Sequence, residues 1–383
     1  MKKKVIVIHT KYTNFGGEDA NIKEEVSLLK NNYEVKYLEF QNTKILNIFD
    51  FISFFNGKNY RSNKQLKKVI KEFKPEVAYV HNTWFKASLG IFEILEKNKI
   101  QTILKIHNFR YDCTKSFLAS SHIENFDFCP RCGFKKKKYQ FLNKYFINSY
   151  LKSIFILLYG KRYFKFLLST KNTIVVLNKF HKDYLNKLGI NNVEVLHNPI
   201  KIDENIRLNN IKDSKTLVYA GQLTPEKGIY ELFESWDKFE NKEFELVIIG
   251  AKKSLNSKML ESFELKNVTF LDELNNSETL KIISKARAVV TATRMYEGQP
   301  RLLSEALSMG IPTIYPYFGG MKEYFPDDYK LSFAQYNYDD LITKMYLLFD
   351  DKFVESERKK ILAYFKKNFE IDLILKKFND LIK

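Results

Sequence analysis

The chain has 383 residues, of which 45% are hydrophobic and 28% are charged. This length exceeds one ordinary core and suits two α/β domains, and the composition excludes a disordered chain. Three cysteines are too few for a disulfide framework, and no apolar stretch approaches the length of a membrane span. The net charge of +18 calls for an anionic partner: nucleic acid, an anionic lipid surface or a phosphorylated substrate. We expect a soluble cytoplasmic protein, or one peripheral on the inner face of the cell membrane.

Short apolar runs alternate with amphipathic stretches through the first half of the chain. The runs predict buried parallel strands at 5–8, 35–38, 77–80, 102–106, 173–177 and 193–196. The stretches predict helices at 21–29, 66–73, 89–95 and 179–188. Such alternation implies βαβ units with right-handed crossovers, and so a doubly wound sheet.

A domain boundary follows the last of these strands. Pro199 ends the regular pattern, and the residues after it are polar and rich in Asn and charge. A second series then predicts strands at 216–220, 246–249, 268–270, 288–291 and 313–315, a helix at 227–239, and only helix from Tyr338 onward. We expect Rossmann-like domains over 1–198 and 216–383 that face each other across a cleft, with a linker over 199–215. The terminal helices are free to pack back on the first domain.

Two glycine-containing segments follow predicted strands. Gly16 and Gly17 lie between the first strand and its helix, where backbone N–H groups can approach a phosphate. A Gly-Gly turn capped by an acidic residue needs no ligand, however. The second segment runs from Gly221 to Gly228, and its Lys227 is predicted in the first turn of a helix. A cation there opposes the helix dipole unless an anion binds, although a solvated lysine on a short turn is the alternative.

The most specific segment covers residues 293–306. Glu297 lies in the loop after a strand, and Glu305 follows eight positions later on a helix that begins near Pro300. The helix start offers unpaired donors to a diphosphate, and a carboxylate suits the two hydroxyls of a ribose. The alternative is a capping carboxylate beside a glutamate on the helix surface.

These segments together resemble the retaining GT-B glycosyltransferases, in particular family 4 of that class. Glu297 and Glu305 match its E-x7-E signature, and Gly221–Gly228 is similar to its G-R-L-x-P-E-K-G motif. The Gly16-Gly17 loop and His197-Asn198-Pro199 are similar to its N-terminal glycine loop and its interdomain junction. The resemblance extends over nearly the whole chain. It implies an N-terminal acceptor domain and a C-terminal donor domain.

The resemblance also implies roles for individual residues. His107 would bond to the donor sugar, Lys227 would neutralise the diphosphate, and Glu297 would contact the transferred sugar. Glu305 would hold the ribose. The remaining donor-site positions are Gly16, Gly17, Gln222, Arg294, Gly298, Pro300, Arg301 and Leu302. Gln222 stands where the family usually has arginine, which removes one expected cation, and Arg294 or Arg301 could replace it.

The resemblance implies a metal-independent reaction with retention by front-face attack, in which the leaving diphosphate accepts the acceptor's proton. The donor is a nucleotide diphosphate-sugar, which is a substrate, so no cofactor is expected. The acceptor is a glycan or a lipid-linked glycan, as in the synthesis of capsule, lipopolysaccharide or another surface polysaccharide. A sugar-nucleotide epimerase of the same shape is one rival, and the E-x7-E pattern argues against it. A basic RNA- or DNA-binding protein is the other, but it leaves Glu297 and Glu305 unexplained.

Two weaker signals lie in the irregular stretch between 109 and 170. Cys113, Cys129 and Cys132 include a C-x2-C spacing that a histidine could complete as a structural zinc site, and free thiols are the alternative. Residues 134–170 interleave lysines with aromatics, which fits a helix lying on an anionic membrane, an RNA-binding surface or a solvated basic face. His9 ends the first strand and could line the cleft, and His81 ends another strand. Both are interpreted as packing or capping residues rather than catalysts.

Overall fold

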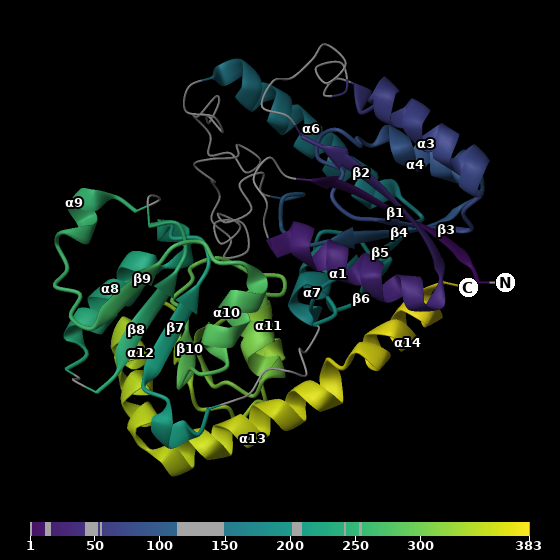
Figure 1. Ribbon diagram of the computed structural model, residues 1–383. Coiled ribbons are helices and arrows are strands. Elements are labelled where there is room, and N and C mark those ends of the chain that lie inside the picture. The colour runs from purple at the N-terminus through teal and green to yellow at the C-terminus, as the bar shows by residue number, and fades with distance from the viewer. Residues whose placement is uncertain are drawn as a thin grey trace. The chain divides into compact units, whose positions relative to one another are not determined.

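The structure is a computed structural model that describes residues 2–11, 17–42, 53, 56–112, 149–200, 209–240, 243–252 and 255–382. The chain divides into two compact units (Figure 1). Met1–Pro199 and Asp372–Lys383 form the first unit, and Ile200–Ile371 forms the second. The last helix thus belongs to the first unit by its contacts, although it follows the second unit in sequence.

The first unit is built on a six-stranded parallel sheet in the order β2-β1-β3-β4-β5-β6. Its strands are β1 (Lys4–Lys11), β2 (Glu34–Gln41), β3 (Val77–Val80), β4 (Gln101–Ile106), β5 (Thr173–Val176) and β6 (Val193–Val195). Its helices are α1 (Gly17–Asn32), α3 (Tyr60–Phe73), α4 (Gly90–Lys97), α6 (Tyr150–Ser169), α7 (Lys179–Lys187) and α14 (Ile371–Leu381). The strands and their parallel pairing confirm the doubly wound arrangement predicted for this half of the chain.

Helices α1 and α14 cover one face of the first sheet. Alternate residues of β1, Val5 and Val7, lie in one buried cluster with Ile374 and Phe378 of α14. The Phe378 ring also packs against the Tyr79 ring of β3, with 5.0 Å between centroids. Helices α3, α4 and α6 lie over the opposite face (Figure 1). The C-terminal helix therefore completes the core of the N-terminal sheet.

The second unit repeats the architecture with six parallel strands in the order β12-β11-β10-β7-β8-β9. These are β7 (Thr216–Ala220), β8 (Glu245–Ile249), β9 (Val268–Leu271), β10 (Ala288–Val290), β11 (Thr313–Tyr317) and β12 (Ser332–Ala334). The α-helices are α8 (Ile229–Lys238), α9 (Ser257–Leu260), α10 (Asn276–Ile283), α11 (Arg301–Ser308), α12 (Tyr338–Tyr346) and α13 (Asp351–Asn368). Short 3-10 turns are η2 (Ile211–Asp213), η3 (Pro225–Lys227), η5 (Gly319–Tyr324) and η6 (Leu347–Phe349).

Both faces of the second sheet are buried. Leu246 and Ile248 of β8 pack in a cluster with residues of α8, whereas Val247 and Ile249 pack in another with residues of α10. This period of two over a continuous apolar run is typical of a parallel strand covered on both sides. The strands predicted in this half are confirmed, and β12 is an additional strand. Ser332–Ala334 escaped prediction because three residues give too short a pattern.

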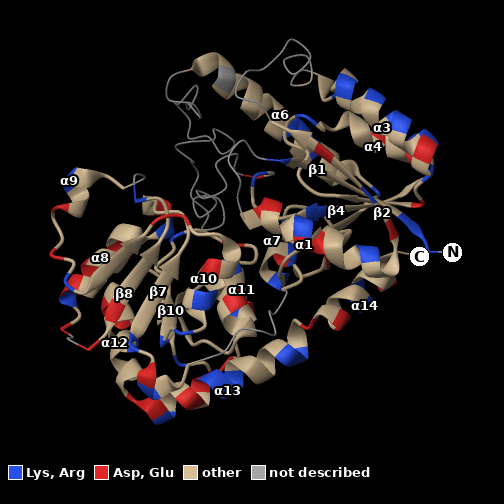
Figure 2. Ribbon diagram, viewed as in Figure 1, with Lys and Arg blue, Asp and Glu red and all other residues tan. Residues whose placement is uncertain are grey.

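Helix α8 begins two residues later than the predicted start at Lys227. Pro225–Lys227 forms a separate 3-10 turn, and Gly228 closes it with a left-handed φ of 70° before α8 starts at Ile229. Lys227 is therefore on the turn rather than in the first turn of an α-helix. Basic and acidic residues are distributed along the helices of both units (Figure 2). No helix among the described residues is long and apolar enough to cross a membrane.

Candidate active site

The two sheets each have one point where the strand order reverses. In an open parallel sheet, ligands bind outside the carboxyl ends of the strands at such a point. It lies between β1 and β3 in the first sheet and between β7 and β10 in the second. The loop after β7 holds Gly221–Gly228, and the loop after β10 holds Glu297. Topology thus brings together two motifs that are far apart in the sequence.

The loop after β7 packs tightly on the loop after β10. A Cβ added at Gly228 would lie 1.8 Å from the backbone oxygen of Ala292, so only glycine fits there. The backbone N–H of Arg294 donates to the Glu226 carbonyl at 3.1 Å. The turn that carries Lys227 is therefore fixed against the chain that carries Glu297.

Lys227 and Glu297 form an ion pair. The lysine side chain is 25% exposed and the glutamate side chain 16%, so both remain partly accessible to solvent. Thr293 Oγ1 lies 3.5 Å from the same carboxylate oxygen of Glu297. The two residues predicted to bind a diphosphate and a sugar thus lie in direct contact.

Glu305 lies in a second polar cluster on α11. Its carboxylate accepts a hydrogen bond from Arg301 Nε at 2.6 Å, one helical turn earlier. The amide orientation of Asn276 that satisfies both neighbours directs its nitrogen toward Glu305, where it donates to Oε1 at 2.9 Å. In the same orientation the Asn276 oxygen accepts a hydrogen bond from Arg301 at 3.2 Å. Glu305 is buried, and Asn276 and Arg301 therefore fix the direction of its carboxylate.

The other residues predicted for the donor site in the second unit lie in the same two loops or in the first turn of α11. Pro300 caps the start of α11, and the Gly298 carbonyl accepts a hydrogen bond from the Tyr324 hydroxyl at 3.0 Å. Leu302 is partly buried against the core. The Gln222 side chain is exposed. Two arginines were considered as replacements for the cation missing at Gln222. Arg294 pairs with Glu231 of α8 at 3.0 Å, whereas Arg301 pairs with Glu305.

In the first unit, three histidines lie at the carboxyl ends of β1, β3 and β4. His9 Nε2 bonds to Asp19 of α1 at 2.8 Å, and both side chains are buried. His81 Nδ1 lies 3.0 Å from His107 Nε2. Burial lowers the pKa of both His81 and His107 well below 6.5, and neighbouring charges add to the effect. The imidazoles of His81 and His107 are therefore neutral at physiological pH.

Gly17 is exposed at the start of α1, whereas Gly16 lies outside the described residues. Cys113, Cys129 and Cys132 also lie outside them, as do residues 134–148 of the basic aromatic stretch. Within the described ranges, no group of three or more His, Cys, Asp or Glu side chains is placed to hold a metal ion.

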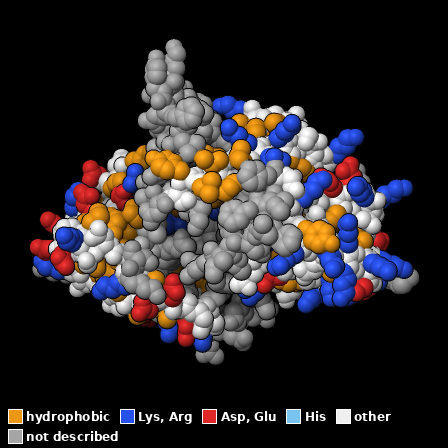
Figure 3. Space-filling view, turned by 90° about the horizontal axis from the view of Figure 1, so that it is seen from above, with side chains coloured by type: hydrophobic (Ala, Val, Ile, Leu, Met, Phe, Trp, Pro, Cys, Tyr) orange, Lys and Arg blue, Asp and Glu red, His pale blue; other side chains and the backbone are white. Residues whose placement is uncertain are grey.

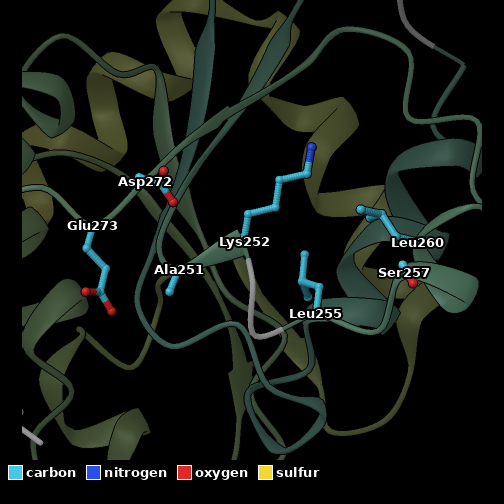
Figure 4. Close-up of a pocket in the computed structure, with 7 residues that line it drawn as sticks. All are labelled: Ala251, Lys252, Leu255, Ser257, Leu260, Asp272 and Glu273. Carbon is cyan, nitrogen blue, oxygen red and sulfur yellow. The ribbon is translucent and has the colours of Figure 1, made fainter.

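A hollow of about 630 Å³ opens at the carboxyl ends of β8 and β9. Asp272 and Glu273 line one side and Leu255, Ser257 and Leu260 the other, and Lys252 extends between them (Figure 4). The Lys252 ammonium lies 4.5 Å from the centre of the Phe270 ring. The volume is within the range of small-molecule sites. No sequence motif pointed to this hollow.

Sequence reasoning also missed Asn276, Glu25 and Lys105. Asn276 is the first residue of α10, and its Asn275-Asn276 pair indicates only a helix start. Lys105 lies within strand β4 and is buried against Glu25 of α1. The sequence did contain a sign of this pair, because Lys105 is an isolated charge in the apolar run 102–106. A charge inside a buried strand needs a partner.

Residues 201–368 match the family described as Glycosyl transferases group 1, a range that nearly coincides with the second unit. The chain is 26% identical over 306 residues to an uncharacterized glycosyltransferase of Methanocaldococcus jannaschii, covering 74% of this chain and 68% of that protein. It is 25% identical over 222 residues to the amylovoran biosynthesis glycosyltransferase AmsD of Erwinia amylovora, covering 55% of this chain and 61% of the relative.

The fold is similar to that of the Anabaena protein HepE in its complex with UDP-glucose. The TM-score is 0.69 at 12% identity, and the likeness covers 98% of both chains. At this identity the likeness concerns the fold alone. The family match over the second unit and the glycosyltransferase relatives support a glycosyltransferase activity, and the chain has two Rossmann-like domains like those of HepE.

Proposed function

We propose that the protein transfers a sugar, with retention, from a nucleotide diphosphate-sugar to a glycan or lipid-linked acceptor in surface polysaccharide synthesis. One observation carries the donor half of this proposal. Lys227, Glu297 and Glu305 all follow β7 or β10, the two strands that flank the reversal of strand order in the second sheet. The complex of the similar fold with UDP-glucose and the amylovoran relative support the substrate classes.

The Lys227–Glu297 pair suggests how the donor is bound. A diphosphate carries more negative charge than one carboxylate, so it competes for the Lys227 ammonium and releases Glu297 toward the sugar hydroxyls. Lys227 then stabilises the charge that develops on the diphosphate as the glycosidic bond breaks. Front-face attack uses the diphosphate oxygen as the proton acceptor, and no separate metal or cofactor takes part in this proposal.

Glu305 has a geometry that suits the ribose. Arg301 and Asn276 both bond to its Oε1 atom, so their contacts orient the carboxylate, which would accept a hydrogen bond from a ribose hydroxyl. The nucleobase then extends along the carboxyl edge of the sheet toward the hollow beside β9. Two strands separate β9 from β10 in the sheet, a span of about 15 Å at about 4.8 Å per strand step, similar to the length of a nucleoside diphosphate.

The proposed membrane contact involves the outer face of α6. Leu151, Ile154 and Leu158 are exposed at helical spacing, and Lys161, Arg162 and Lys165 continue the same face. Hydrophobic and basic side chains lie together on the side of the molecule seen from above, where α6 lies in Figure 1 (Figure 3). Apolar side chains beside lysines on one helix face fit an anionic lipid surface, where a lipid-linked acceptor would be found.

The product of the reaction tests the proposal. The protein is incubated with UDP-, GDP-, ADP- and dTDP-sugars and a simple acceptor, and the anomeric proton of the product is followed by NMR. Retention predicts that the first product has the donor's anomeric configuration. Inversion would contradict the retaining mechanism, and the absence of turnover with every donor and with lipid-linked acceptors would contradict the transferase proposal.

A further inference from the structure

A buried ion pair lies beneath the histidines of the first unit. Lys105 Nζ contacts Glu25 Oε1 at 2.7 Å, and the Tyr79 hydroxyl donates to the same oxygen at 2.8 Å. Lys105, Glu25 and Tyr79 are all nearly inaccessible to solvent. Both contacts use Oε1, so the second carboxylate oxygen of Glu25 is left for another group.

That second oxygen faces His81. Glu25 Oε2 lies 3.9 Å from His81 Nε2, and neither atom has a hydrogen-bond partner in the described part of the chain. On the other side of the ring, His81 Nδ1 lies 3.0 Å from His107 Nε2. The two imidazoles are also nearly parallel, with 25° between their planes. Glu25, His81 and His107 thus form a chain of contacts from the buried ion pair to His107.

Only one proton can lie between His81 Nδ1 and His107 Nε2 when both rings are neutral. Burial keeps them neutral, because it lowers the pKa of each imidazole well below 6.5. The Glu25 carboxylate attracts an N–H, so the His81 proton is favoured on Nε2. His81 Nδ1 then accepts a hydrogen bond, and His107 must donate it from Nε2.

Other charged groups around His81 do not reverse this preference. The Lys105 ammonium is paired with Glu25, and the His9 ring is 6.4 Å away and bonded to Asp19. Tyr79 packs its ring edge against His81 at 4.4 Å, but its hydroxyl donates to Glu25. The carboxylate oxygen that faces His81 Nε2 is therefore Glu25 Oε2, at 3.9 Å.

We propose that Glu25 and His81 are positioning residues that hold the His107 proton on Nε2, so that His107 Nδ1 presents a lone pair to a hydroxyl of the donor sugar. His107 lines a small hollow together with Glu18, Asn108 and Arg110, where such a hydroxyl can approach. The role of His107 toward the sugar rests on the proposed function. The proton arrangement does not, because it follows from contacts within the first unit.

Histidine tautomers of the ligand-free protein test the arrangement directly. The full chain is labelled with ¹⁵N-histidine, and His107 is assigned among the six histidines by comparison with His107→Asn. We expect the bare-nitrogen signal at His107 Nδ1. Finding the His107 proton on Nδ1 would overturn the proposal whether or not the protein is a transferase.

Two variants of His81 separate positioning from packing. His81→Asn places its side-chain oxygen near the original Nδ1 position and should keep the His107 tautomer. His81→Leu removes the acceptor and should give a mixture of tautomers, with the thermal unfolding midpoint reporting whether the variant is folded. An unchanged tautomer in a folded His81→Leu protein would overturn the proposal.

Measurements of sugar turnover then test whether catalysis depends on the His107 tautomer. We expect His81→Leu to lower kcat about 10-fold with little change in the KM of the acceptor, and His81→Asn to restore most of it. Equal kcat values for the wild type and a folded His81→Leu variant would refute the positioning role. A wild type that turns over no sugar nucleotide would refute the proposed function, while the tautomer measurement still decides the proton arrangement.

Discussion

Lys227 and Glu297 lie 70 positions apart in the chain and form an ion pair where the strand order of the second sheet reverses. Gly228 makes the contact possible, because its lack of a side chain lets the turn after β7 lie against Ala292. Under the proposed function, the anionic diphosphate of the donor separates this pair and takes over the contact with Lys227.

Replacing Lys227 tests this contact. Lys227→Met should weaken the binding of the nucleoside diphosphate by about 10- to 100-fold, because a hydrogen bond to a charged group contributes about 1.5–3 kcal/mol. Isothermal titration measures the change. Lys215→Met is the matched control, since Lys215 forms an exposed pair with Glu243 in the same unit and should bind as the wild type does. Equal affinities for both variants would show that Lys227 does not contact the diphosphate.

The packing of the two loops predicts a severe effect at Gly228. Gly228→Ala adds a Cβ at a left-handed φ and against a backbone oxygen, which should cost at least about 2 kcal/mol. We expect the thermal transition of the second unit to fall by several degrees. Gly17→Ala is the control, because a Cβ there meets no atom within 4 Å. Equal midpoints for the two variants would contradict the loop contact.

His181 should make the first unit sensitive to acid. Its ring is buried against Phe109 and Tyr111, with centroid distances of 4.3 and 5.5 Å. Neither ring nitrogen has a hydrogen-bond partner in the described ranges. Burial lowers its pKa from 6.5 to about 3, so below pH 6.5 the unfolded chain binds a proton that the folded chain does not. Stability is therefore lost as the pH falls from about 6.5 toward 3.

His181→Phe should remove this dependence. At pH 5 the wild type loses about 2 kcal/mol relative to pH 8 through this group alone, at about 1.4 kcal/mol for each pH unit below 6.5. The variant should lose less of its thermal midpoint between pH 8 and pH 5, and its midpoint at pH 8 reports any effect on packing. A parallel fall of both proteins would mean that His181 is charged in the folded state or is not responsible.

The outer face of α6 predicts binding to anionic vesicles. Replacing Lys161, Arg162 and Lys165 by Gln should weaken binding about 100-fold in a flotation assay, since each basic residue contributes about 1 kcal/mol. Replacing Leu151, Ile154 and Leu158 by Ser should also weaken it. The control removes three exposed charges from α13, with Gln at Lys359, Lys366 and Lys367. Wild-type binding by both α6 variants would exclude this face as the membrane contact.

Periodic apolar runs were sufficient to predict both parallel sheets, because strands buried on both faces have continuous hydrophobic sequences. The adjacency of Gly221–Gly228 and Glu297 was also predictable, since both follow strands of one sheet. The contacts of Glu25, Lys105 and His81 were not, because they join α1, β4 and β3 through side chains whose directions depend on packing. The interpretation of His81 as a packing residue missed its contact with His107.

The most direct test of the donor site is thermal stabilisation by UDP, GDP, ADP and dTDP, measured on the wild type, on Glu305→Ala and on the exposed control Glu264→Ala. One nucleotide should stabilise the wild type and the control by about 2.7 kcal/mol at 100 times its dissociation constant. Glu305→Ala should lose most of that shift. Stabilisation by none of the four, or an equal shift in Glu305→Ala, would contradict a nucleotide site at β7 and β10, and stabilisation by RNA instead would favour a nucleic-acid-binding protein.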